Sequence, residues 1–209
     1  MEYRWPEKPE TRIRATPDPL KGTMMEPIYL PSAGNDMSRV VNSIFDETKG
    51  LEWLTERSAR KEYFMSTKDR EYSYGNRHQG DVMYRSKPFS FLVGQFMEYI
   101  NETQKSEFNV CFLNRYENEQ QHLGWHADDF PGMRADQSIA VLSLGAEREI
   151  WWKEKSFKGI IPPENKQLLE HGSIWIMPVG FQDVYLHKIP KHGKPCGERI
   201  SLTFRSFVD

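Results

Sequence analysis

The chain has 209 residues, of which 38% are apolar and 13% aromatic, with a formal net charge of −2. This length and apolar content suit one domain with a substantial core, and the near-neutral charge argues against indiscriminate coating of nucleic acid, although a local basic patch remains open. Only two cysteines occur, Cys111 and Cys196, which excludes a disulfide framework and a cysteine-based zinc site.

The first 31 residues are rich in proline, with six of the thirteen prolines of the chain. Proline removes a backbone donor and fixes φ, so this composition predicts an irregular N-terminal arm over residues 1–31. Glu26–Leu30 is the one stretch of the arm that suits an edge strand. We expect residues 32–209 to form a single domain.

Two amphipathic helices are predicted. A turn cluster from Ser32 precedes apolar residues spaced three to four apart, which indicates a helix that ends near Gly50. The second helix is predicted from Phe89 to Ile100, with Pro88 in its first turn.

Between these helices, residues 57–86 alternate tyrosines with arginines, a pattern that predicts short strands. Aromatic rings next to cations can stack on bases and hold phosphates. The structural alternative is an exposed hairpin whose tyrosines serve only for packing. The sequence of this segment does not separate the two interpretations.

After Ile100 the pattern is mainly that of short strands separated by Gly and Pro turns. The predicted strands span residues 108–116, 138–144, 149–153, 167–170, 173–177 and 199–207. Short strands after a helical start predict an α+β, mainly β fold: a double-stranded β-helix of jelly-roll or cupin type, with helices packed outside.

A metal site is suggested by His126 and Asp128, which lie two residues apart. In an extended strand such a pair points to one side, so both side chains can reach one ion. His187 is our candidate for a third ligand among the other five histidines. Two histidines and a carboxylate leave open positions, as in Fe(II) oxygen chemistry. A zinc hydrolase is the rival, because His122 and His126 have helical ligand spacing, but Gly124 between them argues against a helix.

The last predicted strand places Arg199 and Arg205 on its inward face. Buried cations require an anion, so these arginines imply a ligand. Their Cα atoms are about 20 Å apart on strand geometry, which suits the two ends of a dicarboxylate. Asn114 and Tyr116 share one face of the strand over residues 108–116 and offer neutral hydrogen bonds.

Five ordered motifs together resemble the AlkB family of Fe(II)/2-oxoglutarate dioxygenases. They are Asn114-Arg115-Tyr116, His126-Ala127-Asp128, Leu169–Ser173, Tyr185-Leu186-His187 and Arg199–Arg205. The resemblance covers residues 72–207 and implies oxidative demethylation of alkylated nucleobases, such as 1-methyladenine and 3-methylcytosine in DNA, as direct-reversal repair.

The resemblance assigns cofactors and residues. Fe(II) is held by His126, Asp128 and His187, and no catalytic residue apart from these ligands is implied. O2 and 2-oxoglutarate are the co-substrates, and the 2-oxoglutarate site consists of Asn114, Tyr116, Arg199, Ser201 and Arg205. Arg199 pairs with the far carboxylate, while Arg205 and Asn114 lie nearer the metal.

The resemblance also implies a nucleotide-recognition lid at residues 57–86. Tyr84 is the first candidate for contact with the flipped base, Tyr74 the second, and Asp129 a third. Two positions depart from the family pattern: Ser201 replaces a common asparagine, and Phe130 stands where an acidic residue is frequent. The Ser201 departure implies that one hydrogen bond to 2-oxoglutarate is lost or replaced, and the Phe130 departure concerns base preference.

For partners, we expect single- or double-stranded DNA more than RNA, no membrane, and a monomer. The chain shows no run of 18 apolar residues and no signal-like start, so we expect a cytoplasmic protein, nuclear in a eukaryotic host. The same chemistry on RNA, a protein side chain or a small metabolite is an alternative, and so is a catalytically inactive binding domain.

Overall fold

The computed structural model describes residues 28–29, 34–54, 59–76, 80–130 and 132–208. Most of the predicted arm lies outside these residues, as do residues 57, 58 and 77–79 of the predicted lid. Within the arm, Ile28–Tyr29 forms the short strand β1, which pairs at one edge of a sheet as the sequence predicted.

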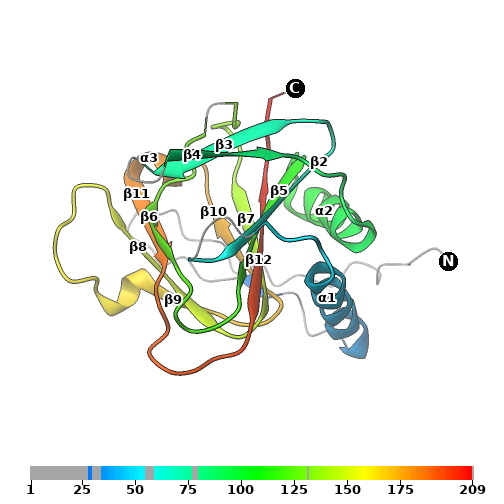
Figure 1. Ribbon diagram of the computed structural model, residues 1–209. Helices are drawn as coiled ribbons and strands as arrows, with labels where there is room; N and C mark the ends of the chain where they lie inside the picture. Colours follow the sequence, from blue (N-terminus) through cyan, green and yellow to red (C-terminus); the bar gives the residue numbers. More distant parts are fainter. Residues whose placement is uncertain (1–27, 30–33, 55–58, 77–79, 131, 209) are drawn as a thin grey trace.

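The larger sheet has six antiparallel strands, with the C-terminal strand β12 near its middle (Figure 1). Its order is β1-β10-β7-β12-β5-β2. The bounds are β2 Lys61–Ser66, β5 Val110–Tyr116, β7 Ile139–Gly145, β10 Ser173–Met177 and β12 Arg199–Arg205. Because β12 pairs with both β5 and β7, its side chains lie in rows with theirs.

The second sheet has four strands in the order β6-β11-β8-β9. Its strands are β6 Leu123–His126, β8 Arg148–Glu154, β9 Lys166–Leu169 and β11 Tyr185–Ile189. A separate hairpin pairs β3 Glu71–Asn76 with β4 Gly80–Arg85 and lies across the top of the two sheets in Figure 1. Two facing antiparallel sheets confirm the predicted jelly-roll core.

The alternation in β12 divides the interior into two layers. Ile200, Leu202 and Phe204 pack with residues of both helices in one apolar cluster. The residues of β12 that alternate with these three therefore face the four-stranded sheet. All of them are buried: Arg199, Ser201, Thr203 and Arg205. The polar face of the central strand thus points into the space between the sheets.

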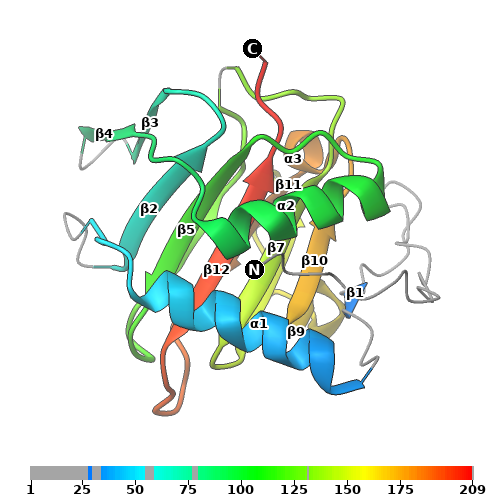
Figure 2. The ribbon, with the colours of Figure 1, turned by 90° about the vertical axis from the view of Figure 1, so that its right-hand side faces the viewer.

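The two predicted helices are α1, Gly34–Lys49, and α2, Phe91–Gln104, and both cover the outer face of the six-stranded sheet (Figure 2). The predicted start of α2 was wrong by two residues, since Ser90 is its N-cap and Pro88 lies before it. The Glu47 carboxylate of α1 accepts hydrogen bonds from the backbone N–H groups of Leu92 and Val93, so α1 caps α2. In the described part of the chain, no helix has the length and apolar character to cross a membrane.

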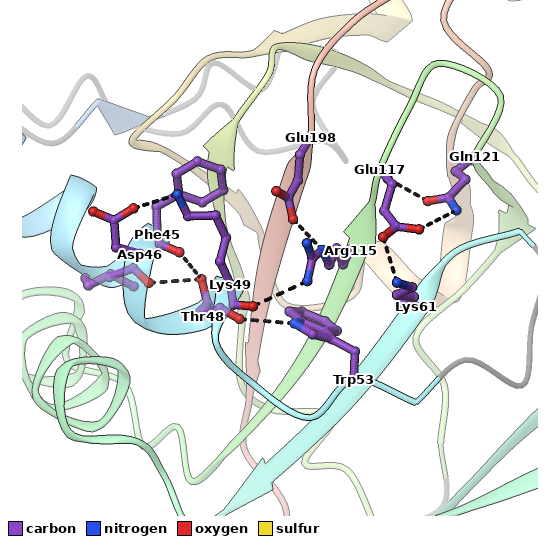
Figure 3. Close-up of polar contacts among 11 residues, drawn as sticks. Phe45, Asp46, Thr48, Lys49, Trp53, Lys61, Arg115, Glu117, Gln121 and Glu198 are labelled. Carbon is purple, nitrogen blue, oxygen red and sulfur yellow. Dashed lines mark hydrogen bonds and ion pairs between the residues drawn. The ribbon is translucent and has the colours of Figure 1, made fainter.

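The C-terminal end of α1 is tied to the sheet by Arg115 (Figure 3). Its guanidinium pairs with Glu198 and donates to the Lys49 carbonyl at 3.4 Å. It also lies 5.7 Å from the ring centre of Trp53, whose indole N–H donates to the Thr48 carbonyl. Arg115 and Trp53 therefore each satisfy one carbonyl at the end of α1, and Arg115 does so on the side of β5 opposite the interior.

Two short helical segments complete the described elements. A 3-10 turn, η2, spans Pro163–Asn165, and the helix α3 spans Phe181–Val184. α3 directly precedes β11 and brings Gln182 next to the loop after β6. This loop carries Asp128.

Candidate active site

The structure brings together the three predicted metal ligands. His187 on β11 is paired directly with His126 on β6, and their ring centroids are 4.1 Å apart. His126 Nε2 lies 3.6 Å from Asp128 Oδ1, and the ligand atoms of all three residues lie within 4.8 Å of one another. Among the described residues this is the one group that could hold a metal ion.

Asp128 reaches this group differently from the prediction. β6 ends at His126, so Asp128 lies in the following loop and not in an extended strand. Its backbone N–H donates to Gln182 Oε1 at 2.8 Å, which fixes the loop against α3. The carboxylate nevertheless lies beside the His126 ring, with Oδ1 3.6 Å from Nε2.

Hydrogen bonds leave the correct atoms free for a metal. His126 Nδ1 lies 2.9 Å from the Gly124 carbonyl, so Nδ1–H donates and Nε2 keeps its lone pair. Arg205 Nη2 and Nε bind Asp128 Oδ2 at 3.0 and 3.3 Å, while Oδ1 faces His126. His126 and Asp128 therefore each offer one unshared ligand atom.

The protonation states of the site also suit a metal ion. Burial, reinforced by His126, lowers the pKa of His187 to about 3. Burial alone would raise the pKa of Asp128, but Arg205 and the two histidines outweigh it and lower this pKa to about 2. Neutral imidazoles and an ionised carboxylate are the forms that bind metal.

Arg199 forms the other end of the site. It is fully buried, and its Nη2 donates to Ser143 Oγ at 2.8 Å. Among the described residues, its Nε and Nη1 make no hydrogen bond of normal geometry, and Tyr116 is a polar neighbour of the guanidinium. Burial lowers the pKa of Arg199 to about 10, so a buried guanidinium is present that an incoming carboxylate would satisfy.

A second buried arginine, Arg148, differs from Arg199 in its hydrogen-bond partners. Arg148 lies 5.5 Å from the ring centre of Tyr116, and Arg199 lies 5.3 Å from the same centre. Arg148 donates to three main-chain carbonyls, those of Asn118, Gln121 and Pro190. Arg148 is thus occupied by the protein itself, whereas Arg199 keeps two donors for a ligand.

The remaining predicted co-substrate residues line the same inward face. Ser201 pairs in register with Asn114 on β5 and with Ser143 on β7, and Arg199 pairs with Tyr116. Asn114 also lines a small cavity that contains His126, Asp128 and Arg205. The residues for both ends of a dicarboxylate therefore share one continuous polar strip next to the metal ligands.

Tyr84 does not lie where the prediction required. It is 1% exposed, and its hydroxyl donates to Glu62 in the core. Tyr84 pairs directly with Tyr72 on the inner side of the hairpin, where both pack on Phe64 and Phe112. This position suits support of the hairpin and not direct contact with a base, which corrects the expectation for Tyr84.

The other two residues predicted to contact the base are Tyr74 and Asp129. The backbone of Tyr74 pairs with Val82, but its side chain lies outside the described residues. Asp129 is exposed and lines a cavity of about 190 Å³ together with Asp128 and residues of α3. Phe130 packs against Tyr72, with ring centroids 4.4 Å apart.

Sequence reasoning missed four polar residues of the site: Arg60, Ser143, Arg148 and Gln182. Ser143 and Arg148 could have been found, since each is a polar residue at an inward position of an apolar strand. Arg60 and Gln182 lie in segments whose local pattern does not specify a face. The rival zinc pair is absent, because His122 precedes β6 and its ring contacts the Gln120 carbonyl.

Known proteins with similar sequences belong to the same class of oxygenases that the metal ligands suggest. The family model for the 2OG-Fe(II) oxygenase superfamily matches residues 34–205. The DNA oxidative demethylase ALKBH2 of Arabidopsis thaliana is 34% identical over 119 residues, covering 48% of this chain and 38% of that protein. ALKBH2 of Bos taurus is 26% identical over 179 residues, covering 80% and 64%.

A solved structure has a similar fold. The match to "The structure of OsALKBH1" has a TM-score of 0.51 at 20% sequence identity and covers 81% of this chain and 93% of that one. The matched segments span between 38% and 64% of the length of the two ALKBH2 relatives.

Proposed function

Because this chain belongs to the AlkB family within the 2OG-Fe(II) oxygenase superfamily, we propose that it removes alkyl groups from nucleobases by oxidation. Its cofactors are Fe(II), 2-oxoglutarate and O2, and His126, Asp128 and His187 are the residues that fit the metal. The observation that carries the proposal is the pairing of this ligand set with Arg199, a buried arginine that retains two unused donors.

The chain's own residues divide the work of binding. Arg199, with Ser143 beside it, would hold the far carboxylate of 2-oxoglutarate, and the three ligands would hold the metal at the near end. Arg205 fixes Asp128 through Oδ2, so that Oδ1 remains a single-atom ligand. Bound Fe(II), with 2-oxoglutarate and O2, supplies the oxidation of a C–H bond, and 2-oxoglutarate leaves as succinate and CO2.

The proposed substrates are 1-methyladenine and 3-methylcytosine in DNA, single- or double-stranded, in preference to RNA. Insertion of one oxygen atom converts the N-methyl group to N-hydroxymethyl. This group leaves as formaldehyde, and the base nitrogen regains its normal valence. The two ALKBH2 relatives are named DNA oxidative demethylases, which supports this choice.

A basic surface supports a polyanionic substrate over a metabolite or a protein side chain. We call it the tryptophan–lysine stripe; it consists of Trp125, Trp151, Lys153, Lys166 and Lys188. It crosses the outer face of the four-stranded sheet, directly behind the two histidine ligands, because neighbouring residues in a strand point to opposite faces.

Rings and cations alternate along the stripe. Lys188 Nζ lies 4.8 Å from the ring centre of Trp125 and 4.4 Å from that of Trp151. Lys153 covers Trp125 at 5.0 Å, and Lys166 covers Trp151 at 4.4 Å. Partial burial and then the two neighbouring lysines lower the pKa of Lys188, so phosphates would relieve repulsion among the three cations.

The hairpin of β3 and β4 is proposed as a lid over the site, within a single domain of residues 32–209. Its inner face packs through Tyr72 beside the cavity that holds His126 and Asp128. Asp129 and Tyr74 stay candidates for base contact. A methylated base must be flipped or presented in a single strand to reach the metal, so a lid next to the ligands suits this substrate.

The test is a panel of DNA and RNA oligonucleotides that carry single methylated bases, assayed for product mass. Methyl loss that requires Fe(II) and 2-oxoglutarate, and that disappears in His126→Ala, is expected for single-stranded DNA. If only RNA, or no oligonucleotide, loses methyl groups while 2-oxoglutarate is still consumed, the DNA assignment is wrong.

A further inference from the structure

Arg60 is a buried arginine beside the metal ligands to which neither the family motifs nor the proposed mechanism gives a role. It is 5% exposed and lines the cavity that contains His126, Asp128 and Arg205. Its Nε donates to Asn114 Oδ1 at 2.6 Å, and its Nη2 pairs with the buried Glu62. Both ends of the guanidinium are therefore engaged inside the protein.

The bond to Asn114 determines how that amide is oriented. A guanidinium can only donate, so the amide atom that faces Arg60 must be the oxygen. The NH2 group of Asn114 is then left as a donor on the strip it shares with Ser201 and Ser143. A donor at this position suits a carboxylate oxygen of 2-oxoglutarate, whereas the flipped amide would present an acceptor.

Glu62 connects this arrangement to the hairpin. Its carboxylate is 3% exposed and takes the Arg60 guanidinium on Oε1 and the Tyr84 hydroxyl on Oε2. Tyr84 belongs to β4 and Glu62 to β2, which pairs with β5 at Asn114. A continuous polar chain thus runs from the hairpin through Tyr84, Glu62 and Arg60 to Asn114.

We propose that Arg60 is a positioning residue for 2-oxoglutarate that acts by fixing the amide of Asn114, and that Tyr84 and Glu62 hold Arg60 in place from the hairpin. The inference rests on the proposed function, because it presumes that 2-oxoglutarate binds between Arg199 and the metal. A buried ion pair adds little net stability on its own. Stability alone therefore does not account for the Arg60–Glu62 pair, and a role in positioning can be tested separately.

The first experiment measures the dissociation constant of 2-oxoglutarate by calorimetry on the full chain loaded with Mn(II), which does not turn over. Arg60→Lys keeps the positive charge for Glu62 but cannot reproduce the Nε bond to Asn114. We expect its dissociation constant to rise about tenfold, as loss of a hydrogen bond to a charged donor predicts, with Mn(II) affinity unchanged.

Arg115→Gln is the matched control, because Arg115 is the next residue after Asn114 but faces the outer side of β5 (Figure 3). It should lower the melting temperature and leave 2-oxoglutarate binding unchanged. A folded Arg60→Lys protein that binds 2-oxoglutarate like the wild type would overturn the inference. If the wild type itself binds no 2-oxoglutarate, the proposed function fails instead.

A double-mutant cycle separates positioning from general damage. If Arg60 acts through Asn114, then Arg60→Lys should have no further effect on binding once Asn114→Ala is present. Additive losses from the two changes would contradict the inference. Tyr84→Phe removes one hydroxyl only, and we expect it to raise the dissociation constant by roughly two- to fivefold through Glu62. An unchanged dissociation constant for Tyr84→Phe would show that the hairpin does not help to position Arg60.

Discussion

Replacement of Arg199 by Met should have opposite effects on co-substrate binding and on stability. The Arg199 guanidinium is fully buried, with one bond to Ser143 and two donor atoms that make no hydrogen bond of normal geometry among the described residues. Removing one member of a buried charge pair costs roughly 3–5 kcal/mol. Binding of 2-oxoglutarate should therefore weaken by a factor of roughly 10² to several times 10³.

Without co-substrate the sign reverses, because the variant no longer buries a cation with unsatisfied donors. Met fills a similar volume, so the free energy of unfolding of the cofactor-free protein should stay equal or increase. Arg148→Met is the matched control. It leaves three main-chain carbonyls without their donor, so it should destabilise the protein.

The assay compares denaturant unfolding and calorimetric binding of 2-oxoglutarate for both variants. If Arg199→Met binds 2-oxoglutarate within fivefold of the wild type, Arg199 does not pair with the co-substrate. If Arg199→Met loses as much stability as Arg148→Met, Arg199 is a structural residue.

Three further predictions concern charge. Replacement of all three lysines of the tryptophan–lysine stripe by Gln should reduce the slope of log affinity against log salt by about 2 for single-stranded DNA; an equal slope would remove the stripe from the interface. Asp128→Asn should abolish Mn(II) binding in a titration and cost roughly 3–5 kcal/mol by leaving Arg205 without its carboxylate, and full stability would contradict this pairing. Burial and then His126 hold the pKa of His187 at about 3, below the value of about 6.5 in the unfolded chain. Between these two values the unfolded state binds more protons, so the free energy of unfolding decreases as pH falls from 6.5 towards 3. By pH 5 metal-free protein should lose up to about 2 kcal/mol in urea unfolding, and His187→Gln should remove that loss.

Much of the fold was predictable because the strands carry a strong period of two. In β12 the alternation of Arg199, Ser201 and Arg205 with apolar residues fixed both the strand and its polar face. The order of His126, Asp128 and His187 along the chain was equally informative, because the motifs around them restrict which histidine completes the site.

The buried face of the β3–β4 hairpin could not be predicted from the period of two. Tyr72 and Tyr84 pair across β3 and β4 and face inward, while Met83, the neighbour of Tyr84 in β4, pairs with Ser73 and is 60% exposed. Local alternation predicts that Tyr84 and Met83 lie on opposite faces, but it does not say which face another element covers. That choice depends on packing against Phe112 of β5, which is distant in sequence.

Arg60 was missed for a related reason. It lies just before β2 in a charged segment, where a solvated arginine is the usual expectation. Its burial follows from two partners, Asn114 and Glu62, that come together only when β2 pairs with β5. No spacing within the segment reports that contact.

We propose that the His126, Asp128 and His187 site couples 2-oxoglutarate oxidation to removal of a methyl group from a base. The most direct measurement counts succinate and formaldehyde released from single-stranded DNA that contains 1-methyladenine or 3-methylcytosine. We expect equal amounts of both products, dependent on Fe(II) and absent in a variant with His126→Ala and Asp128→Ala. Turnover that persists in that variant, or succinate formed without formaldehyde on every methylated oligonucleotide, would contradict it.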